Sequence, residues 1–398
     1  MNEMQIGTLA LIKSGLYGSE EKISPNLNWQ QIYKIGQRHQ IIPLLYYGIV
    51  NSKANVPSDI KNNFYNATVS AVLTDQNQQS ALKQIFNAFE ENNISYLPLK
   101  GTVLKQFYAK PELRTMGDSD ILIKAEEYNK IKDILKNFGF IEITESNHEF
   151  VWNKPNVLYL ELHKKLIPSY NKDYYEYYKN EWAFAKPAKK SRFTLTDEDF
   201  FIYLFTHFSK HYRDGGIGLK HAIDLYVFYK AKPDLNKNYL KNELNKLNLF
   251  TFFKNVSDML FCWFENKPLS ELTDFLTDKI FKSGAYGTKS AHIVATEAKN
   301  AKFKNNKNNN DNKNKKSNKS IKFFKLLRVI FLPYGNMAQK YTILKKIPVL
   351  LPFMWIVRWV QTLILHPQNI KKQKNMLKIV TEENIKQYRK ELEYVGLK

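Results

Sequence analysis

Apolar residues recur at helical spacing through the first 93 residues of the chain. The stretch WQQIYKIGQRHQIIPLLYYGI, residues 29–49, carries them three or four positions apart, and Pro43 marks a break within it. Residues 70–93 repeat this pattern over a longer run and close on two asparagines, which are typical of a helix end. We therefore predict that residues 1–93 form a helical region.

After residue 93 the apolar positions alternate with polar ones, which indicates strands. The predicted strands cover residues 94–99, 118–124, 140–146, 149–152 and 157–166. Helical spacing over 102–109 and 125–139 predicts two helices between the first three strands. Lys154, Pro155 and Asn156 are typical turn residues and connect the last two strands. We assign residues 94–192 to a small α/β core.

Helical spacing returns after about residue 194. Thr196 and Asp199 resemble a capping box before the apolar run of residues 200–212, and residues 219–232 predict another helix. We divide this part into a C-terminal helical domain, 193–296, and a helical tail, 321–398. The predicted fold class is therefore α+β, with a mixed sheet between two helical regions.

The composition of one charged segment predicts disorder between the two helical parts. The formal net charge is +22, and residues 299–320 hold eight Lys and nine Asn against one Asp. Such a composition buries too little apolar surface to offset the entropy of ordering, so we predict a disordered linker over 297–320. The linker and the basic surface fit an anionic partner or a phosphate-bearing substrate. The alternative is that the organism's proteins are generally rich in Lys and Asn, so that the basic charge reflects this composition and no particular partner.

Cysteine content and hydropathy suggest a cytoplasmic protein. Cys262 is the only cysteine, which excludes an internal disulfide and a cysteine metal cluster. The N-terminus lacks the basic start and long apolar run of a signal peptide. The most apolar stretch, 347–357, contains Pro348 and Pro352 and is too short to span a bilayer. We predict a buried helix there, with contact to a membrane surface as the alternative.

Two aspartates stand one residue apart at the start of the second predicted strand. Asp118 and Asp120 share one face of that strand, because alternate side chains point the same way. Carboxylates this close repel each other unless a divalent cation neutralises them. Glu161 lies on the polar face of the last predicted strand and adds a third carboxylate if the two strands are neighbours. The pattern predicts a Mg²⁺ or Mn²⁺ site of Asp118, Asp120 and Glu161, and three carboxylates can hold two metal ions.

A second group of residues predicts phosphate binding. Lys100, Gly101 and Thr102 fall where a strand gives way to a helix, and glycine there lets the backbone approach a phosphate. Lys100 adds a charge and Thr102 a hydroxyl, and Arg114 can reach phosphate oxygens. Gly117 makes the turn before the aspartates. We predict that these five residues bind nucleotide, although a solvated turn lysine is the alternative for Lys100.

Four further polar residues are candidates for substrate contact. His163 shares the strand face of Glu161 and is a base, a partner of a metal ligand or a member of a hydrogen-bond network. His207 and His211 stand one helical turn apart, as metal ligands can, and Asp224 joins them only if its helix packs alongside. We predict substrate contacts for these four residues, with structural roles as the alternative.

The order of these motifs resembles the nucleotidyltransferases of the DNA polymerase β superfamily. The segments LPLKG, GDSDILI and LELH are similar in particular to a bacterial family of uncharacterised nucleotidyltransferases, itself related in pattern to AbiEii-type toxins. The likeness extends over about residues 27–270. It implies a polymerase β-like core with Asp118, Asp120 and Glu161 as metal ligands. The turn departs from the usual Gly-Gly or Gly-Ser, and Ser119 replaces an apolar residue between the aspartates.

These observations predict a Mg²⁺-dependent nucleotidyltransferase that moves a nucleoside monophosphate from an NTP, such as ATP, to an acceptor hydroxyl. The acceptor can be a small molecule, a sugar, RNA or a protein, and the base of the NTP is left open. Two other functions stay open: a non-catalytic nucleotide-binding scaffold, and a toxin-like enzyme that modifies RNA, which the basic surface favours.

Overall fold

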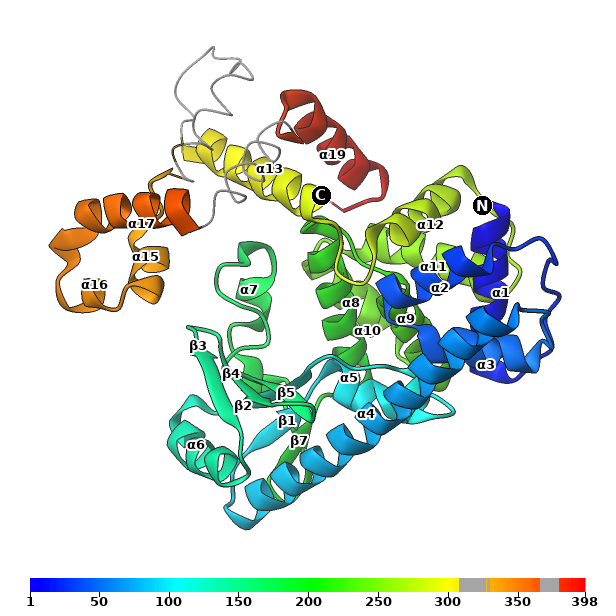
Figure 1. Cartoon of the computed structure of the whole chain (residues 1–398), viewed down its shortest axis with the longest axis horizontal. Coiled ribbons are helices and arrows are strands. Elements are labelled where there is room, and N and C mark those ends of the chain that lie inside the picture. The colour runs from blue at the N-terminus through cyan, green and yellow to red at the C-terminus, as the bar shows by residue number, and fades with distance from the viewer. Residues whose placement is uncertain (308–326, 328–329, 366–378, 398) are drawn as a thin grey trace. The chain divides into compact units, whose positions relative to one another are not determined.

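A computed structural model describes residues 1–307, 327, 330–365 and 379–397 of the chain (Figure 1). The chain divides into two compact units. The larger unit contains Met1–Tyr212, Ile217–Tyr286 and Val395–Lys398, and the smaller one contains Arg213–Gly216 and Gly287–Tyr394. The domain boundaries inferred from the sequence stay a prediction.

The N-terminal region is helical, as the sequence indicates. Its helices are α1 (Glu3–Tyr17), α2 (Trp29–His39), α3 (Ile42–Asn51) and α4 (Ser58–Glu91). Helices α1 and α3 pack closely at two glycines. A Cβ atom added to Gly15 would stand 2.1 Å from the carbonyl oxygen of Leu44, and one added to Gly48 would stand 2.0 Å from that of Leu11. Larger residues at these positions would push the two helices apart.

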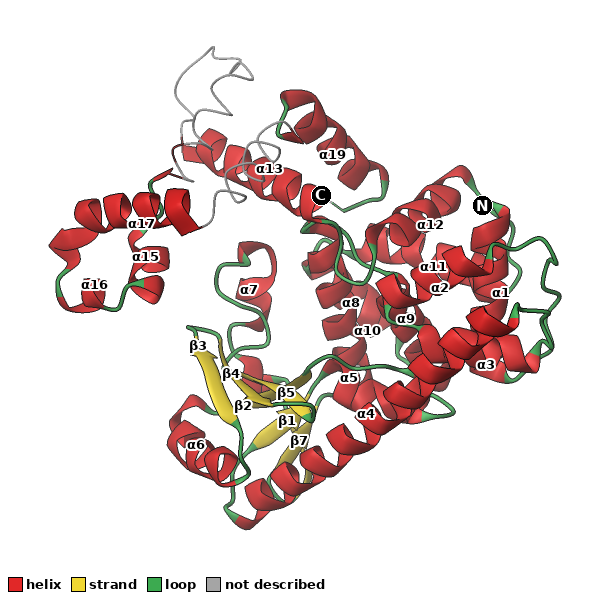
Figure 2. Cartoon of the chain, viewed as in Figure 1, coloured by secondary structure: helices red, strands yellow, loops and turns green. Residues whose placement is uncertain are grey.

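The larger unit contains a mixed seven-stranded sheet, which lies beside α4 and α6 (Tyr128–Asn137) (Figure 2). Its strand order is β3-β4-β5-β2-β1-β7-β6. The bounds are β1 (Tyr96–Pro98), β2 (Ser119–Ile123), β3 (Ile141–Glu145), β4 (Glu149–Lys154), β5 (Leu158–His163), β6 (Lys186–Lys189) and β7 (Arg192–Thr194). Strand β2 pairs antiparallel with β1 and parallel with β5. The predicted α+β class is confirmed.

Strands β6 and β7 were not predicted from the sequence. Both are short and mostly exposed, and they lack the alternation of apolar and polar residues that indicates a strand. Strand β7 pairs parallel with β1 through Tyr96 and Arg192, and β6 adds to its other side. The sheet therefore runs two residues beyond the predicted end of the core at residue 192.

One face of the sheet is covered by α4 and by α6 (Figure 1). Ile85 and Phe89 of α4 pack with Ile131 of α6 and with Ile121 and Leu160 of the sheet. These strand residues alternate with the polar ones, so burying this apolar face turns the polar residues of β2 and β5 toward the opposite side.

The larger unit contains seven further helices among its described residues. They are α5 (Lys100–Leu104), α7 (Lys172–Tyr178), α8 (Asp197–Arg213), α9 (Leu219–Ala231), α10 (Lys237–Lys246), α11 (Phe250–Phe264) and α12 (Glu271–Ser283). Helix α5 lies between β1 and β2, α7 lies between β5 and β6, and the others follow β7. Short 3₁₀ turns cover Lys105–Phe107, Pro111–Leu113, Ala125–Glu127 and Glu181–Ala183. The Thr196 hydroxyl accepts a hydrogen bond of 3.1 Å from the backbone N–H of Asp199 before α8, which agrees with the predicted cap.

The smaller unit contains α13 (Lys289–Lys307), α15 (Tyr334–Lys340), α16 (Ile343–Lys346), a 3₁₀ turn (Pro348–Leu350), α17 (Leu351–Leu365) and α19 (Glu382–Tyr394). Helix α13 covers residues 297–307 of the predicted linker, and the disorder of the linker stays a prediction. Ala298 of α13 packs with Val380 and with Ile385 of α19, and this burial offsets part of the ordering cost. Residues 308–320 of the predicted linker lie outside the described residues. None of the described helices is long and apolar enough to cross a membrane.

Candidate active site

The register between β2 and β5 sets the geometry of the candidate site. In this parallel pair Asp120 lies opposite Glu161, and Leu122 lies opposite His163. The condition on which Glu161 becomes a third carboxylate, that its strand runs beside the aspartate strand, is therefore met. Leu160 and Leu162, which alternate with Glu161, are fully buried in the core on the other face. Packing of the leucines thus directs Glu161 and His163 to the same side as Asp120.

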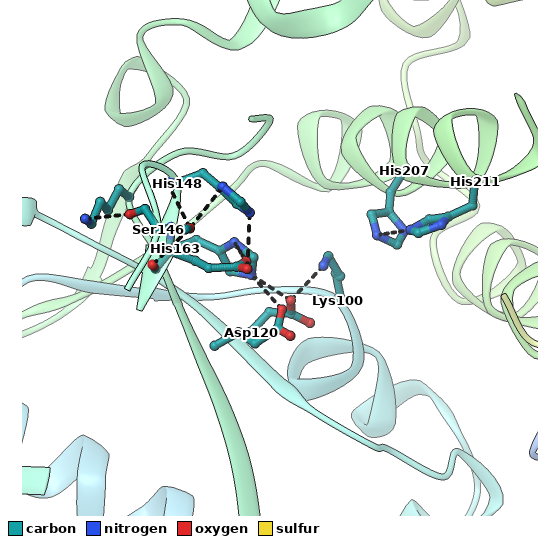
Figure 3. A network of polar contacts seen from close by, with 10 residues as sticks. Lys100, Asp120, Ser146, His148, His163, His207 and His211 are labelled. Carbon is teal, nitrogen blue, oxygen red and sulfur yellow. Dashed lines mark hydrogen bonds and ion pairs between the residues drawn. The ribbon is translucent and has the colours of Figure 1, made fainter. Parts of the chain in front are cut away.

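Asp120 is a buried carboxylate held by the Lys100 ammonium group and the His163 ring (Figure 3). Its Oδ1 atom accepts a hydrogen bond of 2.6 Å from Lys100 Nζ and lies 2.7 Å from His163 Nε2. A carboxylate can only accept, so His163 Nε2 donates. Burial alone would raise the pKa of Asp120, but Lys100 and His163 outweigh it and hold that pKa below its ordinary value. Asp120 therefore stays ionised near neutral pH.

Lys100 reaches Asp120 from an unusual backbone conformation. It stands at the junction of β1 and α5 with a φ of +44°, a region that residues other than glycine rarely adopt. Burial opposes its charge, but the attraction of Asp120 raises the pKa of Lys100 above its ordinary value. In this structure the predicted phosphate-binding lysine neutralises a predicted metal ligand.

The neighbours of Lys100 explain why glycine follows it. A Cβ atom added to Gly101 would stand 3.0 Å from Arg114 Nη1 and 3.1 Å from Met116 Sδ. Thr102 donates its backbone N–H to the Leu99 carbonyl oxygen at 3.2 Å, and its hydroxyl lies 3.9 Å from Met116 Sδ. The glycine therefore has a packing reason besides any approach to phosphate.

Glu161 is a half-buried carboxylate in a negative environment. Burial, and then repulsion from Asp120 and Asp118, raises the pKa of Glu161 to about 7. Its Oε2 atom lies 3.6 Å from His163 Nε2. Ligand atoms of Asp120, Glu161 and His163 all lie within 4.8 Å of one another, which is close enough to share a metal ion. Asp118 is half-buried and lies outside this group of three.

Arg114 and Asp224 form a buried ion pair instead of two separate substrate contacts. Arg114 Nε lies 3.0 Å and Nη2 lies 2.8 Å from carboxylate oxygens of Asp224, and the Tyr108 hydroxyl donates to the same carboxylate at 2.7 Å. Arg114 Nη1 donates to the Thr115 carbonyl oxygen at 2.8 Å. Asp224 is 3 % exposed, and a carboxylate this deeply buried needs a cation. In this structure Arg114 and Asp224 therefore neutralise each other's charge.

His207 and His211 form a contact of their own on α8 (Figure 3). Their Nε2 atoms lie 3.0 Å apart, so one ring donates a hydrogen bond and the other accepts it. Burial, followed by the positive charge of Lys100, lowers the pKa of His207 well below its ordinary value. His207 is therefore neutral at pH 7. Asp224 is engaged by Arg114, so the structure does not join it to these histidines as a third metal ligand.

A cleft of about 270 Å³ brings most of these residues together. The polar face of the sheet supplies one wall, and α8 and α9 supply the other. The predicted site residues that line it are Lys100, Gly101, Arg114, Asp118, Asp120, Glu161, His163, His207, His211 and Asp224. Thr102 and Gly117 do not line this cleft. The residues predicted from the sequence thus include most of the titratable residues that line this cleft. They come from segments up to about 120 positions apart.

Several lining residues were missed from the sequence. They include His148, Glu149, Tyr203, His221 and Tyr286. Glu149 was within reach of prediction, because the β4–β5 hairpin turns about Asn156 and its register places Glu149 opposite His163. His221 and Tyr286 carry no comparable local signal, since tertiary packing alone brings them to the cleft.

The sequence model of a protein family, described as uncharacterised nucleotidyltransferase, matches residues 25–265. This span covers more than half of the chain and includes both walls of the cleft up to His221 and Asp224. The chain belongs to this nucleotidyltransferase family. Membership confirms the resemblance seen in the sequence and implies a polymerase β-like core. Searches of the curated proteins and of the solved structures found no match.

Proposed function

We propose that this protein is a Mg²⁺- or Mn²⁺-dependent nucleotidyltransferase that transfers a nucleoside monophosphate from an NTP to an acceptor hydroxyl and releases pyrophosphate. The observation that carries the proposal is the pairing of Asp120 with Glu161 on adjacent strands, at the wall of a cleft that also holds Asp118. The arrangement occurs in a chain that belongs to a nucleotidyltransferase family.

The donor atoms of the cleft fit a hard divalent cation. Asp120 and Glu161 would hold it, because Mg²⁺ and Mn²⁺ prefer carboxylate oxygens and these two carboxylates already lie close together. Asp118, which lines the same cleft but lies outside this group, would move in to complete the set. Within the described residues Lys100 and His163 both contact Oδ1 of Asp120, so Oδ2 remains available for coordination. A cation bound there would supply the positive charge that an attacking hydroxyl and a leaving pyrophosphate require.

The chain's own residues supply binding, orientation and proton transfer. Lys100 is positively charged at the cleft wall, so its ammonium group can bind triphosphate oxygens once a cation takes over the neutralisation of Asp120. Glu161 lines the cleft, where its carboxylate can accept the proton of the acceptor hydroxyl. Gly101 lines the cleft beside Lys100, and the guanidinium group of Arg114 packs against the same turn.

The experiment is calorimetry with ATP, GTP, CTP and UTP, each in Mg²⁺ and in EDTA. We expect binding only with the metal, because the carboxylates repel a triphosphate unless a cation lies between them. Glu161→Gln should weaken Mn²⁺ binding measured by electron paramagnetic resonance without NTP. Equal NTP binding in Mg²⁺ and EDTA would refute the metal site.

Assays of the purified protein also distinguish the two other candidate functions from the proposed one. A non-catalytic scaffold would bind an NTP but would never release pyrophosphate with any class of acceptor. A toxin-like enzyme would label RNA with α-³²P from the NTP, and Asp120→Asn would abolish the labelling. If the acceptor is a sugar, a small molecule or a protein, that molecule would be labelled instead of RNA. Incubating one labelled NTP with each class of acceptor therefore identifies the acceptor class.

A further inference from the structure

An apolar surface in the smaller unit has no role in the proposed transfer reaction. Helix α15 and α16 pack against the start of α17, with Met337, Ala338 and Leu344 buried beneath Met354 and Trp355. The same segment also exposes large apolar side chains. These are Phe331, Tyr334, Ile343, Ile347, Val349, Phe353, Ile356 and Val360.

Four of these residues form a continuous strip along α17. Phe353, Ile356 and Val360 stand at positions i, i+3 and i+7 of the helix, and Val349 precedes Phe353 by about one turn. We call these four residues the α17 apolar strip. Val349 is 85 % exposed and Phe353 is 61 % exposed. A helix that is apolar on its buried side and on its outer side normally has a second partner.

The inner side of α17 is already satisfied by its own unit. The indole N–H of Trp355 donates to the Leu332 carbonyl oxygen at 2.9 Å, and that of Trp359 donates to the Ile330 carbonyl oxygen at 2.8 Å. The helix is therefore held by contacts that do not involve the strip. Binding of the strip to another surface would leave these contacts in place.

The charge of the surrounding sequence identifies the kind of partner. Residues 312–381 contain 15 Lys and Arg residues and no Asp or Glu. Lys340 and Lys346 from this stretch are exposed within the same group of helices as the strip. An apolar strip with basic residues and without acidic ones is the pattern of a segment that lies in the interface of an anionic membrane.

A second copy of this chain is a poorer occupant. Pairing two strips would bring together two groups of helices that each expose Lys340 and Lys346, and like charges across an interface oppose association. An anionic bilayer attracts the same charges and also accepts the apolar side chains. We propose that the α17 apolar strip, with the exposed Lys340 and Lys346 of the same group of helices, docks this protein on the surface of a bilayer that contains anionic phospholipids.

The test is flotation of the full-length protein with vesicles. One set contains phosphatidylcholine only, and the other contains about 30 mol% phosphatidylglycerol. The variant Phe353→Glu/Ile356→Glu places two charges on the strip. The matched control is Ile6→Glu/Leu73→Glu, which places the same charges on exposed apolar residues of α1 and α4 in the larger unit.

We expect wild type and the control to float with the anionic vesicles and to be released by high salt. The strip variant should partition roughly tenfold or more weakly, because two charges replace two side chains that would enter the interface. Binding that is equal on neutral and anionic vesicles would overturn the proposal, and so would an absence of binding by wild type.

Two further results would assign the strip to a different occupant and overturn the proposal. If wild type is oligomeric by light scattering and the strip variant is monomeric, the strip is an interface between copies. If the strip variant unfolds several degrees below the control without vesicles, the strip is covered by the chain itself. Equal melting temperatures, a monomeric wild type and loss of flotation only in the strip variant support the membrane contact. None of these results depends on transferase activity.

Discussion

Replacing Asp120 by Asn should destabilise this protein strongly in metal-free buffer, although Asp120 is proposed to act in catalysis. The substitution removes the negative charge that pairs with Lys100 Nζ at 2.6 Å and with His163 Nε2 at 2.7 Å. The Lys100 ammonium group then stays largely buried without its counter-ion. Breaking a buried ion pair from one side costs about 3–5 kcal/mol, and the partial exposure of Lys100 places our expectation near 3 kcal/mol.

The matched control is Asp118→Asn, which makes the same chemical change two residues away. Asp118 is half-buried at the cleft, and it raises the pKa of Glu161 by repulsion instead of holding a cation tightly. We expect a change in the free energy of unfolding within about 0.5 kcal/mol for this variant. Both are measured by urea unfolding in EDTA, followed by tryptophan fluorescence.

A double-mutant cycle with Lys100→Met tests the cause. If the ion pair is responsible, the loss in Lys100→Met/Asp120→Asn is smaller than the sum of the single losses by about 2 kcal/mol. Additive losses would show that Lys100 and Asp120 act independently. Equal stabilities of Asp120→Asn and Asp118→Asn would refute the reasoning, because only one of the two carboxylates is paired.

Three further predictions follow from the same site. Mg²⁺ should stabilise Lys100→Met more than wild type in thermal unfolding, because the ion no longer competes with an ammonium group for Asp120; equal stabilisation would contradict this competition. The folded-state pKa of Glu161, about 7, lies above its ordinary 4.5, so the folded protein binds this proton more tightly and loses stability as the pH rises from 4.5 to 7. In EDTA, wild type should therefore lose about 2 kcal/mol more than Glu161→Gln across this range, and parallel pH profiles would contradict the shift. Arg114→Met and Asp224→Asn should each lower the free energy of unfolding by about 3 kcal/mol, whereas Arg114→Met/Asp224→Asn should lose less than the sum; wild-type stability in both single variants would contradict the buried pair.

Local periodicity determined a large part of the candidate site. The alternation of leucines with Tyr159, Glu161 and His163 predicts that the polar residues share one face of their strand, and the alternation about Asp120 predicts the same for the aspartates. The structure places those two faces side by side, through the parallel pairing of β2 with β5. A period of two is a property of the strand itself, so it is readable wherever one face must be buried.

Tertiary structure decided which partner each charged side chain meets. Arg114 and Asp224 are 110 positions apart, and nothing in either segment indicates that α9 brings its carboxylate to that arginine. Lys100 was expected to meet phosphate, yet its backbone conformation and the fold of β2 turn it toward Asp120. Strands β6 and β7 form mainly because β1 offers an unpaired edge. The physical reason is common to all three. Periodicity reports which face of an element is buried, whereas a buried charge or a free strand edge is satisfied by whichever distant group the packing brings within reach.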